Sequence, residues 1–268
     1  MSMLRKAILI PALALALLAQ SAYAQKAKPV LVVSVSGVKN LFDDVEYLAG
    51  AAGASEYANL MKLMAGPYTA GIDKTKPWGA VVKSDGDEFM PVVFVPVKKL
   101  QDVFDALEPQ IGKPTDAGDG VWEITDPAPV FVKEHEGFAF LANEAKYLKK
   151  LPKDPIALLD GLDKQYDIAA RAYLSNVSQE HKDWAIDQMK DQNRRALERQ
   201  KRDKGEDDPE YQLAVRLSET QIQRLSDLIN DGETVTVGWS TDGMAKKTFF
   251  EFSMSAAEGT PTAKRIAL

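Results

Sequence analysis

The sequence predicts an α+β protein with largely antiparallel sheets and helices packed on them. Three observations lead to this prediction: short runs rich in β-branched and aromatic residues, Asp-Gly pairs between neighbouring runs, and stretches with apolar residues at helical spacing. Asp85-Gly86 and Asp242-Gly243 each lie between two such runs. An Asp-Gly pair in this position is typical of a tight hairpin, so we expect the flanking strands to be antiparallel.

The first part of the chain is predicted to be a strand, two helices and a strand pair. These elements are expected at 30–36, 38–52, 55–65, 78–83 and 89–97. Gly37 ends the first strand, and Gly66-Pro67 ends the second helix. The last strand contains Val92–Val95, which is apolar on both faces and therefore predicts a central strand that is covered on both sides.

The middle of the chain is predicted to add a helix, three short strands and a short helix. Their expected ranges are 98–111, 121–125, 130–133, 138–142 and the residues between Asn143, as a helix cap, and Pro152. Residues 151–166 begin with two prolines and alternating charges, which is the composition of a linker.

The second part repeats the order of the first. We expect a strand at 168–174, a long helix from Ser178 to about Lys204, a second helix at 210–229, and a hairpin on either side of Asp242-Gly243. The two long helices are predicted to form a helical hairpin, because Gly205–Pro209 breaks the helical pattern between them.

This repetition suggests an internal duplication of a strand-helix-helix-strand-strand unit. The expected organisation is a first α+β unit at 25–150, a linker at 151–166 and a second α+β unit at 167–268. The second unit ends soon after its hairpin, whereas the first continues for several elements. It is therefore expected to be either a shortened copy or incomplete at its C-terminus.

Residues 1–24 have the features of a secretory signal peptide. Arg5 and Lys6 form a basic start, Ala7–Ala19 is a short apolar run, and Ala22-Tyr23-Ala24 supplies the small residues before a cleavage site. The run is shorter than the about 20 residues that span a membrane, so we expect cleavage and no stable membrane insertion afterwards. Removing 24 of 268 residues, two of them basic, leaves 244 residues with a net charge of −8 in place of −6.

The composition excludes several chemistries and favours one compartment. The chain has no cysteine, which excludes disulfides, thiolate nucleophiles and cysteine-ligated metals. An exported protein without cysteine fits a bacterial periplasm or cell surface better than a eukaryotic secretory pathway. An acidic chain is also a poor partner for nucleic acid, because the phosphates would repel it.

The chain also resembles a group of known proteins. The leader, the strand that ends in Ser34-Val35-Ser36 before a helix pair, and the Asp-Gly hairpin that ends in Val92–Val97 occur in one order. In this combination the chain resembles uncharacterised exported proteins of planctomycete-type bacteria, over much of the mature sequence. The resemblance implies an exported location and transfers no catalytic residue, cofactor or partner.

The predicted helical hairpin carries the candidate binding residues. Its first helix has few large apolar residues, and its basic end faces the acidic turn Glu206–Asp208. One interpretation is a solvated helix pair whose charges are satisfied locally. The other is a projecting arm that binds a protein or an anionic envelope polymer. On the second interpretation the candidate partner-binding residues are Trp184, Arg194, Arg195 and Arg199.

No sequence motif specifies catalysis, a cofactor or a metal. His135 and His181 could each act as a general base, but neither accompanies a recognisable nucleophile or metal motif. Two groups of acids could bind calcium, although acids are also common in turns. These groups are Asp85, Asp87 and Glu88, and Asp116, Asp119 and Asp126. We therefore predict no cofactor, metal site or catalytic residue.

Two functions remain as hypotheses. The leading one is a non-catalytic exported domain that binds a protein or an envelope component through its sheet surface or its helical hairpin. The competing one is a periplasmic hydrolase that uses carboxylates or a single histidine. An enzyme should have a pocket with convergent polar groups and shifted pKa values, whereas a binding domain should have an exposed apolar or charged patch. The oligomeric state is left open.

Overall fold

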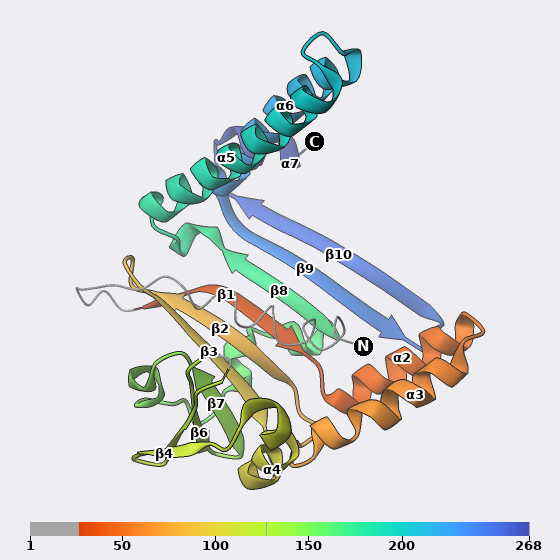
Figure 1. Cartoon of the computed structure of the whole chain (residues 1–268), viewed down its shortest axis with the longest axis vertical. Coiled ribbons are helices and arrows are strands. Elements are labelled where there is room, and N and C mark those ends of the chain that lie inside the picture. The colour runs from red at the N-terminus through yellow and green to blue at the C-terminus, as the bar shows by residue number, and fades with distance from the viewer. Residues whose placement is uncertain (1–26, 127, 268) are drawn as a thin grey trace. The chain divides into compact units, whose positions relative to one another are not determined.

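The computed structural model describes residues 27–126 and 128–267, so the predicted signal peptide lies outside the described residues. The described chain is an α+β protein, which confirms the predicted fold class (Figure 1). It contains a single ten-stranded sheet with the strand order β10-β9-β8-β1-β2-β3-β7-β6-β5-β4. In the larger part of this sheet, from β1 to β4, each strand is antiparallel to its neighbour.

The first part of the chain forms its elements in the predicted order. They are β1 (Lys28–Val35), α2 (Val38–Ala51), α3 (Ser55–Ala65), the 3-10 turn η2 (Pro67–Thr69), β2 (Trp78–Ser84) and β3 (Phe89–Pro96). β2 lies between β1 and β3, with Val81 opposite both Val32 and Val92. In the turn between β2 and β3 the Asp85 carboxylate accepts the backbone N–H groups of Asp87, at 3.2 Å, and Glu88, at 3.0 Å. This acid therefore holds the turn.

The middle segment adds four strands in place of the three predicted. Its elements are α4 (Leu100–Ile111), β4 (Thr115–Gly118), β5 (Val121–Ile124), β6 (Val130–His135), β7 (Phe138–Ala142) and the 3-10 turn η3 (Ala145–Leu148). β4 was not predicted because its sequence, Thr115–Gly118, has no alternation of apolar residues, and all four residues are exposed. The helix expected after Asn143 is only the single turn η3, which begins after Glu144 and has no side-chain cap.

β7 is buried on both faces, whereas β3 is buried on the face of Phe94 and Pro96 and only half-buried on the other. Phe94 and Phe140 are fully buried on these neighbouring strands, with ring centroids 6.1 Å apart. On α4, Leu100 and Phe104 pack against a cluster that includes Val132. Burial of each such side chain stabilises the fold by roughly 1.5–3 kcal/mol, so this cluster fixes α4 on the sheet.

Residues 151–166, expected as a linker, are packed against the sheet. They contain the 3-10 turns η4 (Ile156–Leu159) and η5 (Leu162–Lys164), which contact β1. Leu159 and Leu162 are fully buried. Gly79 makes room for this packing, because a Cβ there would lie 2.5 Å from Leu159 Cδ2 and 2.3 Å from the Val33 carbonyl oxygen. The prolines and charges of this segment therefore surround two core leucines.

The second part of the chain also follows the predicted order. Its elements are β8 (Ile168–Tyr173), the 3-10 turn η6 (Leu174–Asn176), α5 (Gln179–Lys204), α6 (Pro209–Asp231), β9 (Gly232–Asp242), β10 (Lys247–Ala256) and α7 (Pro261–Ile266). Ser178 caps α5 by accepting the His181 N–H, and Asp208 caps α6 by accepting the N–H groups of Glu210 and Tyr211. Pro209 at the first position of α6 completes this helix start.

The long helices α5 and α6 pack along one another (Figure 1). The side chain of Asn193 on α5 donates to Ser218 Oγ on α6 at 3.3 Å, and Ser226 is buried. Leu225 on α6 is 46% exposed.

The described chain divides into two compact units. The first comprises the described residues up to Arg171 together with Thr236–Phe252, and the second comprises Ala172–Val235 together with the residues from Ser253 onward. Residues 151–166 therefore lie inside the first unit. The two halves of the chain share the succession strand, two helices, strand, strand, and the strand order runs β10-β9-β8 on one side and β1-β2-β3 on the other. A shared succession alone does not establish a duplication, which stays a prediction.

Candidate functional site

The ribbon formed by β9 and β10 has a register that two side-chain pairs define. The Thr241 and Thr248 hydroxyl oxygens lie 3.0 Å apart near the turn, and those of Thr234 and Ser255 lie 2.8 Å apart at the other end. The same number of residues separates the two pairs on each strand, so the ribbon between them contains no bulge. Side chains that meet in this way lie on one face of the ribbon.

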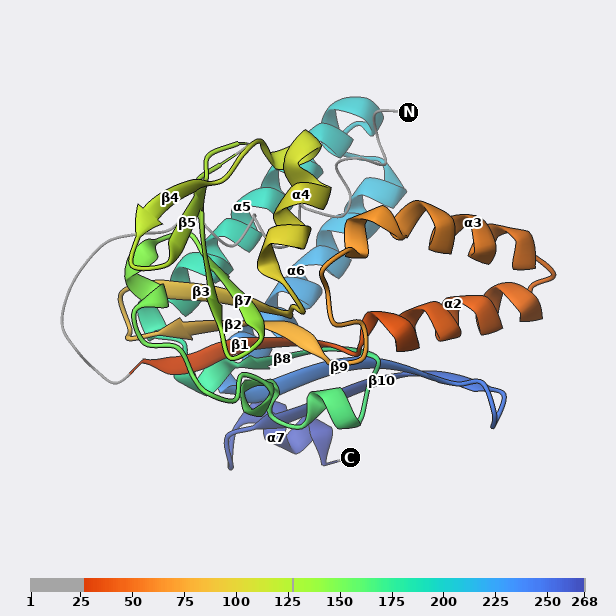
Figure 2. The ribbon, with the colours of Figure 1, turned by 90° about the horizontal axis from the view of Figure 1, so that it is seen from below.

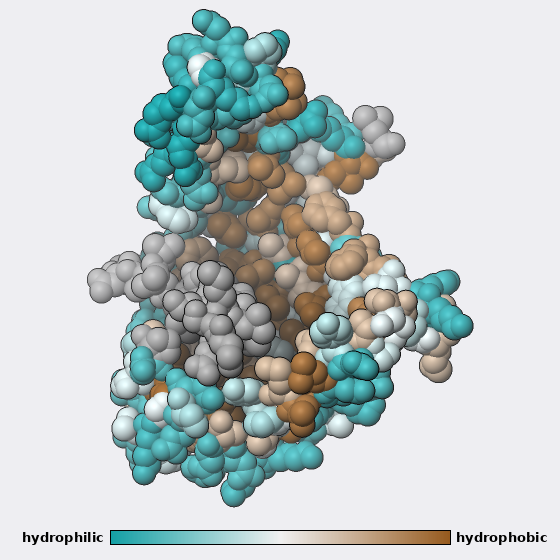
Figure 3. Space-filling view, turned by 45° about the vertical axis from the view of Figure 1, so that its right-hand side comes forward, coloured by the Kyte–Doolittle hydropathy of each residue, from teal (hydrophilic) through white to brown (hydrophobic). Residues whose placement is uncertain are grey.

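This register places four large apolar side chains on one face of the ribbon. Trp239 lies opposite Phe250, and Val237 lies opposite Phe252, all on the face of Thr241 and Thr248. Phe250 is 79% exposed, Phe252 is 61% exposed and Val237 is 49% exposed. We call Val237, Trp239, Phe250 and Phe252 the apolar ribbon face. Figure 3 shows hydrophobic residues gathered over the sheet, across the middle of the visible face.

The opposite face of the ribbon is better covered. A Cβ at Gly238 would lie 2.3 Å from the Tyr166 ring, so the ring packs directly on the glycine backbone. Burial and a hydrogen bond to Glu251 raise the pKa of Tyr166. The Arg171 guanidinium donates to Thr236 Oγ1 at 2.9 Å on this same face. Tyr166 and Arg171 therefore cover β9 on this face, whereas Val237 of β9 is 49% exposed on the apolar ribbon face.

A second exposed apolar surface lies on α3 and the turn after it. Its members are at helical spacing, and all of them are more than half exposed: Tyr57, Leu60, Met61, Met64 and Tyr68. Ala58 is the buried residue of α3. The helices α2 and α3 stand beside the end of the β9/β10 ribbon (Figure 2), where the Tyr47 ring lies 3.5 Å from a Cβ built on Gly243.

The candidate binding residues of α5 are all exposed on that helix. Trp184 is 52% exposed, and it shares a face with Arg195, which is about 16 Å further along the axis. Arg199 lies one turn beyond Arg195, and its Nε donates to the Arg195 carbonyl oxygen at 3.2 Å. Arg194 pairs with Asp191 at 3.0 Å. The structure thus groups the arginines and leaves Trp184 apart from them. Hydrophilic residues cover the far end of the helix pair, at the top of Figure 3.

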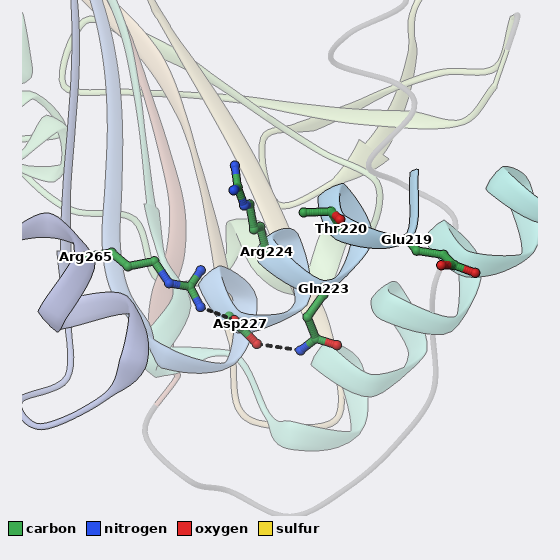
Figure 4. Close-up of a pocket in the computed structure, with 6 residues that line it drawn as sticks. All are labelled: Glu219, Thr220, Gln223, Arg224, Asp227 and Arg265. Carbon is green, nitrogen blue, oxygen red and sulfur yellow. Dashed lines mark hydrogen bonds and ion pairs between the residues drawn. The ribbon is translucent and has the colours of Figure 1, made fainter. Parts of the chain in front are cut away.

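An open groove of about 610 Å³ lies on α6 and α7. It is lined by Glu219, Thr220, Gln223, Arg224, Asp227 and Arg265 (Figure 4). Asp227 accepts from Arg265 at 2.5 Å and from Gln223 at 2.7 Å, and these partners lower the pKa of its carboxyl. Three of the polar side chains of the groove therefore satisfy one another, and the ion pair joins α7 to α6.

Two carboxylates lie close together where β1 leads into α2. Asp44 is only 8% exposed, and its Oδ2 has no hydrogen-bond partner within the described ranges. Burial, Asp167 and Asp43 raise the pKa of Asp44 to about 6. The backbone of Asp167 accepts the Ser36 N–H at 2.7 Å, and its carboxylate accepts the Thr241 N–H at 2.7 Å. Asp167, just before β8, therefore bonds to the chain after β1 and to β9, beside the buried carboxyl of Asp44.

The histidines and some of the candidate calcium ligands have local structural roles, as when the Asp116 carboxylate accepts the Gly118 N–H at 2.8 Å. His135 lies on β6 with its ring centroid 6.4 Å from that of Phe140. His181 Nδ1 lies 2.6 Å from Ser178 Oγ in the first turn of α5. Within 27–126 and 128–267 no group of three or more His, Asp or Glu side chains is arranged to hold a metal ion. In the same ranges no helix is long and apolar enough to cross a membrane.

The described residues form an α+β protein with two exposed apolar surfaces, on the β9/β10 ribbon and on α3, and a group of exposed arginines on α5. Comparison with known protein families, with curated proteins and with solved structures finds no match. Function is therefore inferred from the surfaces and buried groups of the chain itself.

Proposed function

We propose that this protein is a non-catalytic, exported binding domain of the bacterial envelope, and that it binds through the apolar ribbon face. The observation that carries the proposal is the exposure of Phe250 and Phe252, side by side on the ribbon, at 79% and 61%. The signal peptide that the sequence predicts and the resemblance to planctomycete-type exported proteins support the location.

The size of the apolar ribbon face suits a binding role. A phenylalanine side chain buries about 200 Å² when it is fully covered, so Phe250, Phe252 and Val237 together offer on the order of 350 Å² of apolar area. This is the size of the largest patch on a typical monomer, and such patches are often functional. At about 25 cal/mol per Å², covering it supplies roughly 9 kcal/mol before the costs of association are subtracted.

The proposal is tested by photo-crosslinking in living cells. Benzoyl-phenylalanine is placed at Phe250 or at Phe252, and at Thr115 on β4 as a control on the opposite sheet edge. We expect discrete crosslinked products from the two ribbon positions and none from the control. The identity of each product by mass spectrometry then names the partner. Equal labelling at all three positions, or no product at the ribbon positions, would contradict the proposal.

The basic end of α5 is a second candidate surface for the same function, suited to an anionic partner. Arg194→Glu with Arg195→Glu reverses two exposed charges and should abolish binding to such a partner. Lys190→Glu, which changes an exposed cation one turn earlier, is the matched control. If the double variant binds as the unaltered protein does, this surface is not used.

The alternative function is a periplasmic hydrolase that uses carboxylates or a single histidine. The raised pKa of Asp44, a buried carboxyl beside Asp167, favours it, because a carboxyl whose pKa is raised by burial is suited to general acid-base catalysis. Asp44→Asn would abolish turnover of chromogenic ester or glycoside substrates if these acids were catalytic. We expect no such turnover by the unaltered protein, and a saturable activity that this substitution removes would favour the hydrolase.

A further inference from the structure

The two edge strands of the sheet differ in length and in the exposed apolar residues that they carry. β4, at one edge, has four residues, carries Asp116, and has an irregular register between Asp116 and Gly118. Short, charged and bulged strands are the devices by which proteins prevent pairing at a sheet edge. This edge is therefore protected against a second chain.

β10, at the other edge, is long and contains no proline, and it carries one cation and one anion, Lys247 and Glu251. It has ten residues, about twice the usual strand length. Its residues 247–253 are all exposed, including three phenylalanines. A long, exposed, apolar edge strand offers a row of backbone N–H and C=O groups to an incoming strand. The short, irregular edge at β4 and the long, exposed edge at β10 point to β10 as the pairing edge.

The charges on β10 identify the incoming strand. Lys247 and Glu251 lie on one face of the strand, on either side of Phe249 and two positions from it. When two copies of β10 pair antiparallel about a two-fold axis through Phe249, Lys247 of each copy lies directly opposite Glu251 of the other. Shifting the axis to Phe250 or to Glu251 removes both opposite-charge pairs. Only the Phe249 register satisfies the charges.

We propose that β10 pairs with β10 of a second copy of this chain in the Phe249 register, so that the two sheets become continuous in a symmetric dimer. Within the described ranges, no ion pair joins Lys247 to a carboxylate, so this side chain is available. The pairing uses the backbone edge and the charges of the other face. It is therefore independent of what the apolar ribbon face binds.

The dimer is tested by charge reversal on protein purified after expression of the full chain. Sedimentation equilibrium over about 1–100 µM should show a dimer for the unaltered protein. Lys247→Glu places four acidic side chains at the two sites, and Glu251→Lys places four basic ones there. Each variant should dimerise at least tenfold more weakly. Lys246→Glu, which changes the neighbouring residue that has no charge opposite it, is the control and should leave the dimer intact.

A mixture of the two reversed variants separates loss of pairing from loss of folding. In a heterodimer of Lys247→Glu with Glu251→Lys, every acidic side chain again faces a basic one, so mixing two monomeric variants should form a dimer. The double variant Lys247→Glu/Glu251→Lys should also dimerise by itself. A monomeric unaltered protein, a dimer that either single variant leaves unchanged, or a mixture that stays monomeric would each overturn the proposal.

Discussion

Asp44→Asn should stabilise the protein at neutral pH. The carboxyl of Asp44 is buried beside Asp167 and Asp43, and its pKa is about 6 against the ordinary value of 3.8. At pH 7.5 the folded state must therefore hold an ionised carboxylate that has little water around it. An asparagine has almost the same shape and carries no charge, so it removes this cost.

The sign and size of the effect follow from the raised pKa. Between about pH 4 and pH 6 the folded state binds more protons at Asp44 than the unfolded state, so this group's contribution to stability falls as the pH rises. The contribution is constant again above the folded pKa. A difference of about two pH units corresponds to roughly 1–3 kcal/mol once some solvent screening is included. This equals several degrees in Tm for a chain of this length.

Thermal unfolding between pH 4 and pH 8 measures the effect. Asp44→Asn should raise Tm at pH 7.5, and its advantage should shrink towards zero near pH 4. Asp102→Asn is the control, because Asp102 is exposed, pairs with Lys99 at 2.8 Å and is not among the charges that act on Asp44. It should give no stabilisation at any pH. An advantage of Asp44→Asn that stays constant from pH 4 to pH 8, or a loss of stability throughout, would refute the reasoning.

Three further substitutions test local features of the fold. Glu88→Gln should lower the free energy of unfolding by about 1 kcal/mol at pH 7, and this loss of stability should shrink below pH 4. The reason is that hydrogen bonds from Lys146 and Tyr147 lower the pKa of the Glu88 carboxyl. Urea unfolding at both pH values measures the difference. Gly79→Ala should lower the free energy of unfolding by more than about 2 kcal/mol in the same assay, because the new Cβ would lie 2.3 Å from the Val33 carbonyl oxygen. Gly50→Ala is the control and should be neutral or stabilising, because Gly50 is in a helix and the nearest atom to its new Cβ is 3.7 Å away. Asp208→Ala should lower helix stability by about 1 kcal/mol through loss of the α6 cap, and Asp208→Asn should retain most of it, as circular dichroism melting would show.

Most helices and strands could be predicted because their signals are local. Ser178 caps α5, Asp208 caps the helix that starts at Pro209, and the Asp85 carboxylate holds the turn between β2 and β3. Each of these depends on neighbours within a few residues. β4 could not be predicted because its pairing with β5 alone makes it a strand, and none of its side chains is buried.

The segment 151–166 shows a limit of composition as a guide. Its prolines and charges are typical of a linker, yet Leu159 and Leu162 are fully buried against the sheet. Whether an isolated leucine enters a core depends on whether the surface that it faces has room for its side chain. Here the room comes from the absent side chain of Gly79, which lies 80 residues earlier than Leu159 and carries no signal of such a contact in the sequence.

The candidate surface was only partly visible in the sequence for a related reason. The alternation of Phe250, Phe252 and Met254 predicts a strand with one apolar face, and apolar faces of strands are usually buried. Periodicity states which side chains share a face, but not whether another element covers that face. The same limit applies to α3, where residues at helical spacing are exposed.

Substitutions on the apolar ribbon face should change binding without changing the stability of the fold. A side chain contributes to folding through the area that it loses to solvent between the unfolded and the folded state. Phe250 at 79% exposure loses little of its area, whereas Phe94 loses all of it. Phe250→Ser should therefore leave the free energy of unfolding nearly unchanged while Phe94→Ala costs about 3–5 kcal/mol. If Phe250→Ser abolishes crosslinking at the ribbon and leaves the melting curve in place, the lost binding belongs to the surface and not to the fold.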